Sequence, residues 1–344
     1  MSRFGRQYRG ILPLLCVLLV FVTLASIRWG AVPISLSDMF AALRSTLTGA
    51  GAASLDQRIF IEIRLPRALL TMFVGSSLAV GGALMQALFR NPIVEPGLIG
   101  TSSGAAFGAA LYFVLGASLK VHTGPYTLPI AACIGGALAT WLVFRLSGAH
   151  VTGKSSVVAL LLTGIAVNAL FMSGVGFLSY MARDPQARSI TFWNLGTLSG
   201  ASWSSVVIVG LTTVFGIIGS LRYAQPLNAL MLGEDEAGYL GVRVQRLKYA
   251  VLAVNVMMVA VATAFVGVIA FVGLIVPHLL RMLRGADNRF LIAGGALAGG
   301  IVLGIADIVA RLVLAPAELP IGVVTSVVGV PVFLVLLRRR SYFF

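Results

Sequence analysis

Charged residues are scarce in this chain of 344 residues. Asp, Glu, Lys and Arg together make up 10% of it, whereas about a quarter of the residues of an average soluble domain are charged. Hydrophobic residues reach 58%, and the mean hydropathy is +0.99. This composition excludes an ordinary soluble protein. It indicates an integral membrane protein with enough apolar residues for about ten spans of about 20 residues each.

Cysteine and histidine are also rare, with two and three copies. Cys16 and Cys133 lie in apolar runs, where a free cysteine behaves as a small hydrophobic residue, so we expect no disulfide framework. His122, His150 and His278 are too scattered to suggest haem or metal ligation. A membrane enzyme is disfavoured because no convergent set of His, Asp, Glu and Cys stands out. We expect the chain itself to bind no cofactor and no metal.

Long apolar runs and glycine are abundant instead. The runs exceed the roughly ten alternating residues of an outer-membrane barrel strand, which excludes a barrel. The 39 glycines suit helices that approach closely inside a membrane, as do the pairs Gly104/Gly108, Gly295/Gly299 and Gly300/Gly304. The predicted fold is all-α, with one polytopic membrane domain over residues 1–344. Breaks at charged or Pro/Gly-rich points predict ten transmembrane helices, near 11–29, 67–88, 98–117, 127–146, 156–180, 204–222, 249–267, 269–284, 291–310 and 321–337.

The distribution of basic residues predicts the orientation. With the N-terminus inside, 16 of the 25 Lys and Arg residues fall on one side, which the positive-inside rule makes cytoplasmic. Both termini are then cytoplasmic. Topology explains the net charge of +14 better than nucleic-acid binding does. Ile11 to Ile27 follows a basic tail but lacks a signal-peptide cleavage site, so we interpret it as a retained first span. We expect periplasmic segments at about 30–63 and 182–203, the second with a short helix at the membrane surface.

Two motif matches lack the context that their chemistry needs. "GAHVTGKS", Gly148 to Ser155, fits the phosphate-loop pattern, but that loop works between a buried strand and a helix. Here the flanks are predicted spans, so we interpret the stretch as a basic cytoplasmic turn. "GTSSG", Gly100 to Gly104, fits a nucleophile elbow, which needs a strand, a turn and a helix with an acid and a histidine downstream. Small residues that open a span explain it better.

Cations at the outer mouth of two predicted spans suggest a binding surface. "IRLPRALL" places Arg64 and Arg67 at the outer end of the second span, with Pro66 suited to a first helical turn. Arg311 follows Asp307 by four residues, a spacing that allows an ion pair on one helix face. Three outward arginines suit charge-complementary docking of an acidic partner. Interfacial snorkelling of long side chains is the simpler alternative for the first two.

A polar break interrupts the apolar sequence at the cytoplasmic end of the second span. In "FRNPIVEPGLIGTSSGA", Asn91 with Pro92 and Pro96 with Gly97 make turns in which a helix cannot continue. Such backbone at membrane depth needs protein or water around it. Together with Gln86, just upstream, Asn91 and Pro92 are candidates for a translocation path or its inner closure, and a plain loop is the alternative.

An acidic cluster is conspicuous in so basic a chain. "LGEDEAGYLGV" holds three of the 11 acidic residues side by side, Glu234, Asp235 and Glu236. In a first helical turn they would face the positive end of the helix dipole, and Gly241 is placed to end that helix. The result is about two turns, too short to span, within a cytoplasmic element at about 229–248. A solvated loop would explain the polarity but not the repeated Leu-Gly flanks, so we predict a rigid element made to fit a cleft.

These motifs resemble those of the iron-chelate and cobalamin permease family, the FecCD-type transmembrane subunits of type II ATP-binding-cassette (ABC) importers. "RLPRALL", "GGALMQALFRNPIVEPGLIGTSSGA", "LGEDEAGYLGV", "FVGLIVPHLLR", "ADIVARL" and "ELPIGVVTSVVGVPVFLVLL" stand in the family's order over nearly the whole chain. The haem-uptake branch is the most similar. The resemblance implies ten spans, a bacterial inner-membrane location and contact with membrane lipid. It also implies three kinds of protein partner: a second copy of the chain, two cytoplasmic ATPase subunits that use ATP and Mg, and a periplasmic substrate-binding protein.

The resemblance also implies roles for individual residues. Arg64, Arg67 and Arg311 match outer arginines that meet carboxylates on the binding protein. The coupling helix that sits in an ATPase cleft matches Gly233, Glu234, Asp235, Glu236, Ala237, Leu240 and Gly241. Asn91 matches a polar position of the inner closure. The family's gate at the start of the fifth span aligns poorly with "KSSVVALLL", so no gate residue is assigned.

The cargo stays open among haem, a ferric siderophore and cobalamin. An ion-coupled secondary transporter is the rival class. Such transporters usually need ionisable residues at mid-membrane, and Asp307 is the sole candidate, already explained by Arg311. Uptake that a protonophore abolishes would favour that rival.

Overall fold

The computed structural model describes residues 10–30, 34–48, 54–118, 124–147 and 157–338, and these ranges contain helices and turns but no strand. The predicted turn at Gly148 to Ser155 lies outside them. The elements are, in chain order, α2 (Ile11–Arg28), α3 (Leu36–Thr48), α4 (Leu55–Arg58), η1 (Ile59–Arg64), α5 (Leu65–Leu88), η2 (Pro96–Ile99), α6 (Thr101–Ser118), α7 (Thr127–Leu146), α8 (Val157–Met181), α9 (Asp184–Asn194), α10 (Trp203–Leu232), α11 (Glu234–Tyr239), α12 (Val244–Val266), α13 (Val272–Arg284), α14 (Asn288–Leu312) and α15 (Ile321–Arg338).

Several of these helices are long enough to cross a membrane. Among the described residues, seven helices reach the length and apolarity of a span, and α6 and α15 are somewhat shorter apolar helices. With α13 they correspond one to one to the ten predicted spans. The prediction of an all-α polytopic membrane protein is therefore confirmed. The short helix predicted within 182–203 is also present, as α9.

The eighth predicted span, 269–284, is wrong at its start. α13 has 13 residues and rises about 20 Å, less than the roughly 30 Å of a hydrocarbon core. Non-helical backbone precedes it, and Phe271 has a φ of 68°. The Phe271 N–H donates a hydrogen bond of 2.8 Å to Oε1 of Glu95, from the loop after α5. That carboxylate gives the broken backbone the partner that it needs inside a membrane domain.

Two other predicted spans are too short. The second span, predicted at 67–88, begins at Leu55, because α4, the π-helical turn η1 and α5 run on as one helix. Pro66 lies in the first turn of α5, as predicted, but the wider η1 turn precedes that turn without a break in the helix. The sixth span, predicted at 204–222, continues through Pro226 to Leu232. Polar residues near its end signal the approach to the cytoplasm and not the end of the helix.

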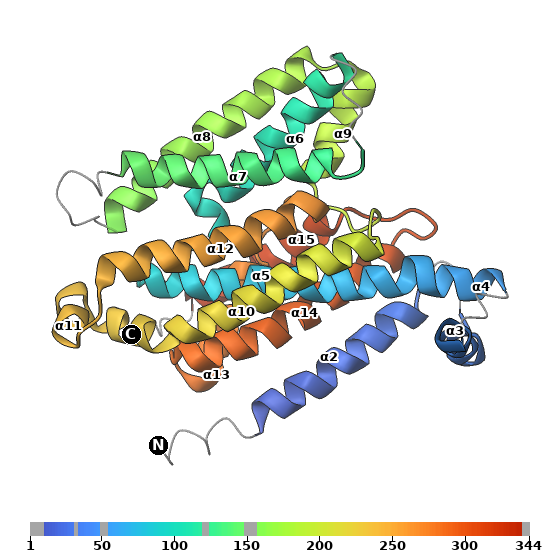
Figure 1. The fold of residues 1–344 in the computed structure, drawn as a ribbon, viewed down its shortest axis with the longest axis horizontal. Helices are drawn as coiled ribbons and strands as arrows, with labels where there is room; N and C mark the ends of the chain where they lie inside the picture. The colour runs from blue at the N-terminus through green and yellow to red at the C-terminus, as the bar shows by residue number, and fades with distance from the viewer. Residues whose placement is uncertain (1–9, 31–33, 49–53, 119–123, 148–156, 339–344) are drawn as a thin grey trace.

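Helix α5 is the centre of the molecule. It packs against α10, α12, α13 and α14, and nearly every residue of its length is buried. Helices α6, α7, α8 and α9 form a second group, which contacts the first mainly through α12 (Figure 1). Because α5 has no lipid-facing side, its sequence is apolar all round.

Glycines let helices of both groups approach closely. A Cβ on Gly75 of α5 would overlap the carbonyl of Gly299 on α14, and a Cβ on Gly104 of α6 would overlap the carbonyl of Gly135 on α7. The predicted small-residue pairs thus mark real helix contacts, as expected where van der Waals packing holds spans together.

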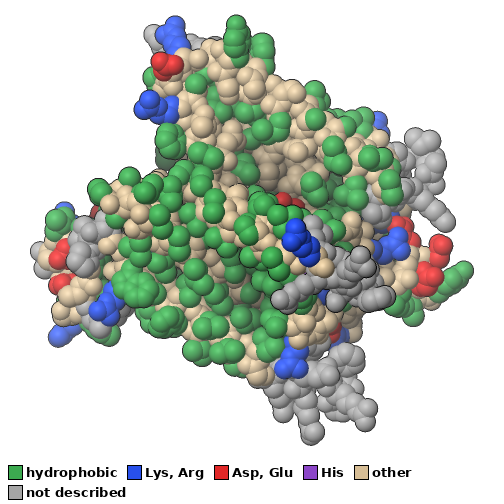
Figure 2. All heavy atoms as spheres, turned by 180° about the vertical axis from the view of Figure 1, so that it is seen from behind, with side chains coloured by type: hydrophobic (Ala, Val, Ile, Leu, Met, Phe, Trp, Pro, Cys, Tyr) green, Lys and Arg blue, Asp and Glu red, His purple; other side chains and the backbone are tan. Residues whose placement is uncertain are grey.

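The two ends of the molecule differ from its middle in the type of side chain at the surface. Hydrophobic side chains cover most of the middle of the face in Figure 2, and charged side chains gather mainly toward the ends. Figure 1 shows α11 at one end and α3, α4 and α9 at the other, with α2 running toward the second end. The predicted cytoplasmic and periplasmic segments therefore lie at opposite ends.

Candidate functional site

The arginine cluster, defined as Arg64, Arg67 and Arg311, lies at the end of the molecule that carries α4. Its members come from η1, from the first turn of α5 and from the last turn of α14. All three are buried, with exposed fractions of 7%, 9% and 5%. A buried cation is costly unless it is paired and hydrogen-bonded, so the partners of these side chains decide what the cluster can do.

Arg67 links two carboxylates. Its Nε and Nη2 donate to Oδ1 of Asp307 at 3.0 and 2.8 Å, and its Nη1 donates to both oxygens of Glu318 at 2.9 Å. Asp307 is fully buried, whereas the Glu318 side chain is 42% exposed. The segment after α14 that carries Glu318 folds back, because the N–H of Leu319 donates to the carbonyl of Ala310. Arg67 therefore has one inner partner and one at the surface.

The other two arginines hold the end of α2. Nη1 of Arg64 and Nη1 of Arg311 both donate to the carbonyl of Trp29, at 2.7 and 2.8 Å. Nη2 of Arg311 also donates to the carbonyl and hydroxyl of Ser26 at 2.9 Å. The last carbonyls of a helix lack partners within it and carry partial negative charge, so they suit guanidinium groups. A Cβ on Gly30 would overlap the Arg64 guanidinium, so a larger residue there would require that side chain to shift.

The predicted ion pair between Asp307 and Arg311 is present, with Nη2 of Arg311 3.0 Å from Oδ2 of Asp307. All three arginines are buried and turned toward carboxylates and carbonyls of the same chain. A docking role stays a prediction. It now needs a route by which a partner's carboxylate reaches a side chain that is already engaged.

At the opposite end, the coupling element, defined as residues 233–241, joins α10 to α12. Gly233, with a φ of 146°, separates α10 from α11, and Gly241, with a φ of 83°, follows α11. The three acids fill the first turn of α11, as predicted. Lys248 of α12 is 2% exposed, and its Nζ lies 2.9 Å from each carboxylate oxygen of Glu234. Ala237 is fully buried in the same core cluster as Leu227, Leu230 and Leu247. The element is therefore fixed rigidly to the spans on either side.

Large apolar side chains project from this polar end. Tyr239 is 91% exposed, Leu232 69% and Leu240 64%. Exposed apolar groups of this size on a rigid polar surface are typical of protein contacts. Leu240 belongs to the predicted coupling set, but Leu232 and Tyr239 do not. Tyr239 could have been identified as a contact residue from the sequence, because it is an aromatic residue in a loop predicted to be cytoplasmic.

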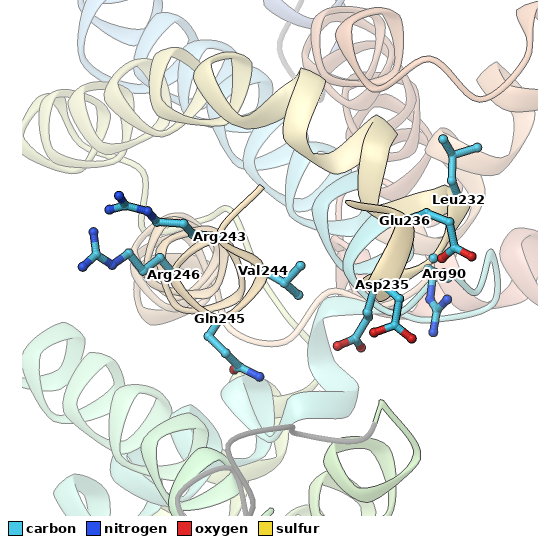
Figure 3. Close-up of a pocket in the computed structure, with 10 residues that line it drawn as sticks. Arg90, Leu232, Asp235, Glu236, Arg243, Val244, Gln245 and Arg246 are labelled. Atoms are coloured by element: carbon cyan, nitrogen blue, oxygen red, sulfur yellow. The ribbon is translucent and has the colours of Figure 1, made fainter. Parts of the chain in front are cut away.

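A pocket of about 870 Å³ lies beside the coupling element. It is lined by Arg90, Leu232, Gly233, Glu234, Asp235, Glu236, Arg243, Val244, Gln245 and Arg246. Figure 3 shows the carboxylates of Asp235 and Glu236 near Arg90 on one side, while Arg243 and Arg246 extend from the start of α12 on the other. Arg90 has a φ of 49° and directly precedes the polar break at Asn91. The loop after α5 therefore borders the coupling element.

The residues predicted for an inner closure make internal contacts. Gln86 is fully buried; its Nε2 donates to the carbonyl of Leu274 at 3.1 Å, and its Oε1 accepts from Nη2 of Arg281 at 3.3 Å. Asn91 is half-buried, and its Oδ1 accepts from the N–H of Ile93 at 3.0 Å, while Pro92 is buried beside it. Gln86 thus links α5 to α13, and Asn91 shapes a turn. Their part in a path or closure stays a prediction.

Most of the chain matches one family. The sequence model of the family described as the FecCD transport family matches residues 18–339. The hemin transport system permease protein HmuU of Yersinia pestis is 42% identical over 334 residues, which cover 97% of each chain. The cobalamin import system permease protein BtuC of Halobacterium salinarum is 40% identical over 291 residues, covering 85% of this chain and 76% of that protein.

The fold is similar to that of a solved structure. An inward-facing metal-chelate type ABC transporter superposes with a TM-score of 0.84 and 32% identity over 96% of this chain and 100% of that chain.

Proposed function

Because this chain belongs to the FecCD transport family and is the permease of an ABC importer, we propose that its cargo is haem. A periplasmic binding protein delivers the haem, which crosses the bacterial inner membrane between two copies of this chain. Two separate ATPase subunits drive the import with ATP and Mg. The observation that carries the choice of cargo is the 42% identity to a hemin permease along 97% of both chains. A ferric siderophore and cobalamin are the alternatives, the second supported by the cobalamin permease relative.

Reconstitution tests the cargo. We expect liposomes that hold the permease and its ATPase, supplied with the cognate binding protein, to hydrolyse ATP faster and to accumulate cargo when haem is added. Ferric siderophore and cobalamin, at equal concentration, should leave both rates at the unstimulated level. A protonophore should have no effect, because ATP and not an ion gradient supplies the energy. Stimulation by cobalamin or siderophore alone would overturn the choice of haem.

Binding-protein docking uses the arginine cluster by exchange of partners. Glu318 is the exposed partner of Arg67, so a carboxylate from outside can replace it while Asp307 keeps the inner side of the guanidinium compensated. Because the Glu318 side chain is partly exposed to solvent, its ion pair with Arg67 is screened by water, so replacing Glu318 by an outside carboxylate costs little free energy. Arg64 and Arg311, which hold α2, keep the surroundings of Arg67 rigid and positive.

Substitution Glu318→Gln tests the exchange. We expect it to strengthen docking of the cognate binding protein by up to about fivefold at low salt, since the guanidinium loses its internal competitor. Binding-protein affinity for the permease in nanodiscs, measured at two salt concentrations, gives the readout. Glu62→Gln is the matched control, because Glu62 is exposed on the same end of the molecule but outside the cluster. Equal affinities for the two variants would contradict exchange at Arg67.

The coupling element transmits the ATPase motion. Its anchoring through Lys248 and Ala237 suits a part that must move the spans and not bend on its own. Closure of the ATPase pair pushes on residues 233–241 and changes which end of the passage is open. The exposed Leu232, Tyr239 and Leu240 supply the apolar contact.

A further inference from the structure

An apolar groove runs along the outside of the molecule between α7 and α12. One part is lined by Tyr126, Pro129, Ile130, Cys133, Ile208, Val261, Ala264 and Phe265. The next part, of about 640 Å³, is lined by Cys133, Ala137, Thr140, Trp141, Phe144, Arg145, Tyr249, Leu252, Ala253, Val256, Met257, Ala260 and Val261. Cys133 and Val261 line both parts, so the two hollows adjoin each other along α7 and α12 and together make up the groove.

The groove is long enough for an extended acyl chain. From Pro129 to Arg145 on α7 a helix rises about 24 Å, most of the roughly 30 Å thickness of a hydrocarbon core. Helices α7 and α12 pack against each other, so their contact forms the floor of the groove. The small residues Ala137 and Ala253 lie on opposite walls, and they leave the space open.

Among the described residues that line the groove, the one charged side chain lies at the cytoplasmic end. Arg145 lies in the last turn of α7 and is exposed, and Tyr249 lies near the start of α12, with its ring centroid 5.9 Å from that of Phe144. The hydroxyl of Thr140, within the groove, is bonded to the carbonyl of Gly136 at 3.0 Å. The remaining lining residues are hydrophobic. An apolar slot ending in an arginine and a tyrosine matches an acyl chain below an anionic headgroup, because both residues favour the lipid headgroup region.

We propose that this groove binds one anionic phospholipid of the inner leaflet, with its phosphate at Arg145 and one acyl chain between α7 and α12. A zwitterionic lipid fits the slot equally well but has no net charge for Arg145 to attract. The site is separate from the coupling element and from the arginine cluster. Lipid binding at this site requires neither the cargo nor the ATPase.

Native mass spectrometry tests the headgroup contact. The permease is taken from nanodiscs of equimolar phosphatidylglycerol and phosphatidylcholine, and retained lipids are counted. We expect phosphatidylglycerol to be preferred about fivefold and Arg145→Gln to abolish the preference. Arg145→Lys should preserve the preference. Arg222→Gln, which removes an exposed arginine of α10 outside the groove, should also preserve it. An equal loss in Arg145→Gln and Arg222→Gln would overturn the proposal.

Trp141 reports on the acyl chain, because it lines the groove and is 58% exposed. We expect phosphatidylglycerol brominated on its acyl chain to quench the fluorescence that Trp141→Phe removes, at lipid fractions where brominated phosphatidylcholine does not. Filling the slot with Ala137→Phe should reduce that selective quenching by more than half. Absence of quenching would mean that protein, such as a second copy of the chain, covers the groove, and would overturn the proposal.

Discussion

Replacing Asp307 with Asn is expected to lower the free energy of unfolding by about 3–5 kcal/mol, the usual cost of removing one partner from a buried ion pair. Asp307 is fully buried and is the carboxylate that Arg67 and Arg311 share. Its loss would leave two guanidinium groups beside a neutral amide in a region that water does not reach. Equilibrium unfolding of the purified permease in mixed micelles measures the difference.

Glu318→Gln is the matched control for Asp307→Asn. It removes the other carboxylate from Arg67, but that carboxylate is 42% exposed, so the expected loss is about 1 kcal/mol or less. Arg67→Met in the Asp307→Asn background should recover part of the stability, because it removes one of the uncompensated charges. Equal losses for Asp307→Asn and Glu318→Gln would show that burial does not control the energetics of the cluster.

Replacing Tyr239 and Leu240 together with Ala is expected to weaken association with the ATPase subunits by at least about 30-fold and to abolish haem uptake. Exposed aromatic residues that enter a partner's cleft often contribute about 2 kcal/mol or more. Both side chains are well exposed, so their truncation should leave the fold intact. ATPase affinity for the permease in nanodiscs and uptake into proteoliposomes are the two readouts.

Tyr180→Ala provides the control for this double substitution. Tyr180 is 89% exposed, close to the 91% of Tyr239, but it lies near the end of α8, at the other end of the span from the predicted cytoplasmic side. It should leave both ATPase affinity and uptake at the level of the unmodified protein. Normal uptake in the Tyr239→Ala, Leu240→Ala variant would rule out the coupling role, and unchanged unfolding would exclude misfolding as the cause of any loss.

Some features could be predicted from the sequence because they depend on residues that are close together in the chain. The acids of α11 occupy its first turn as predicted, because negative charge at a helix N-terminus and glycine at either side are local signals. The pairing of Asp307 with Arg311 followed from their spacing on one helix. Both depend on residues only a few positions apart.

Features that depend on residues far apart in the chain could not be predicted. Glu318 lies 251 positions from Arg67, and Ser26 lies 285 positions from Arg311. Nothing in the local pattern around "RLPR" indicates either partner. The late start of α13, at Val272, likewise depends on a distant carboxylate, that of Glu95. A window of apolar residues cannot distinguish a helix from buried irregular backbone.

The sequence by itself determined that this protein is a helical membrane protein, and it predicted how its segments alternate between the two sides and which end carries the coupling element. Apolar content, charge distribution and short-range spacing suffice for these, because the membrane selects for them directly. Only the tertiary structure decided that the arginines are buried and engaged, that Glu318 is the exposed partner, and that a groove lies between α7 and α12. Those properties arise where distant helices meet, since packing and charge compensation are settled between elements and not within them.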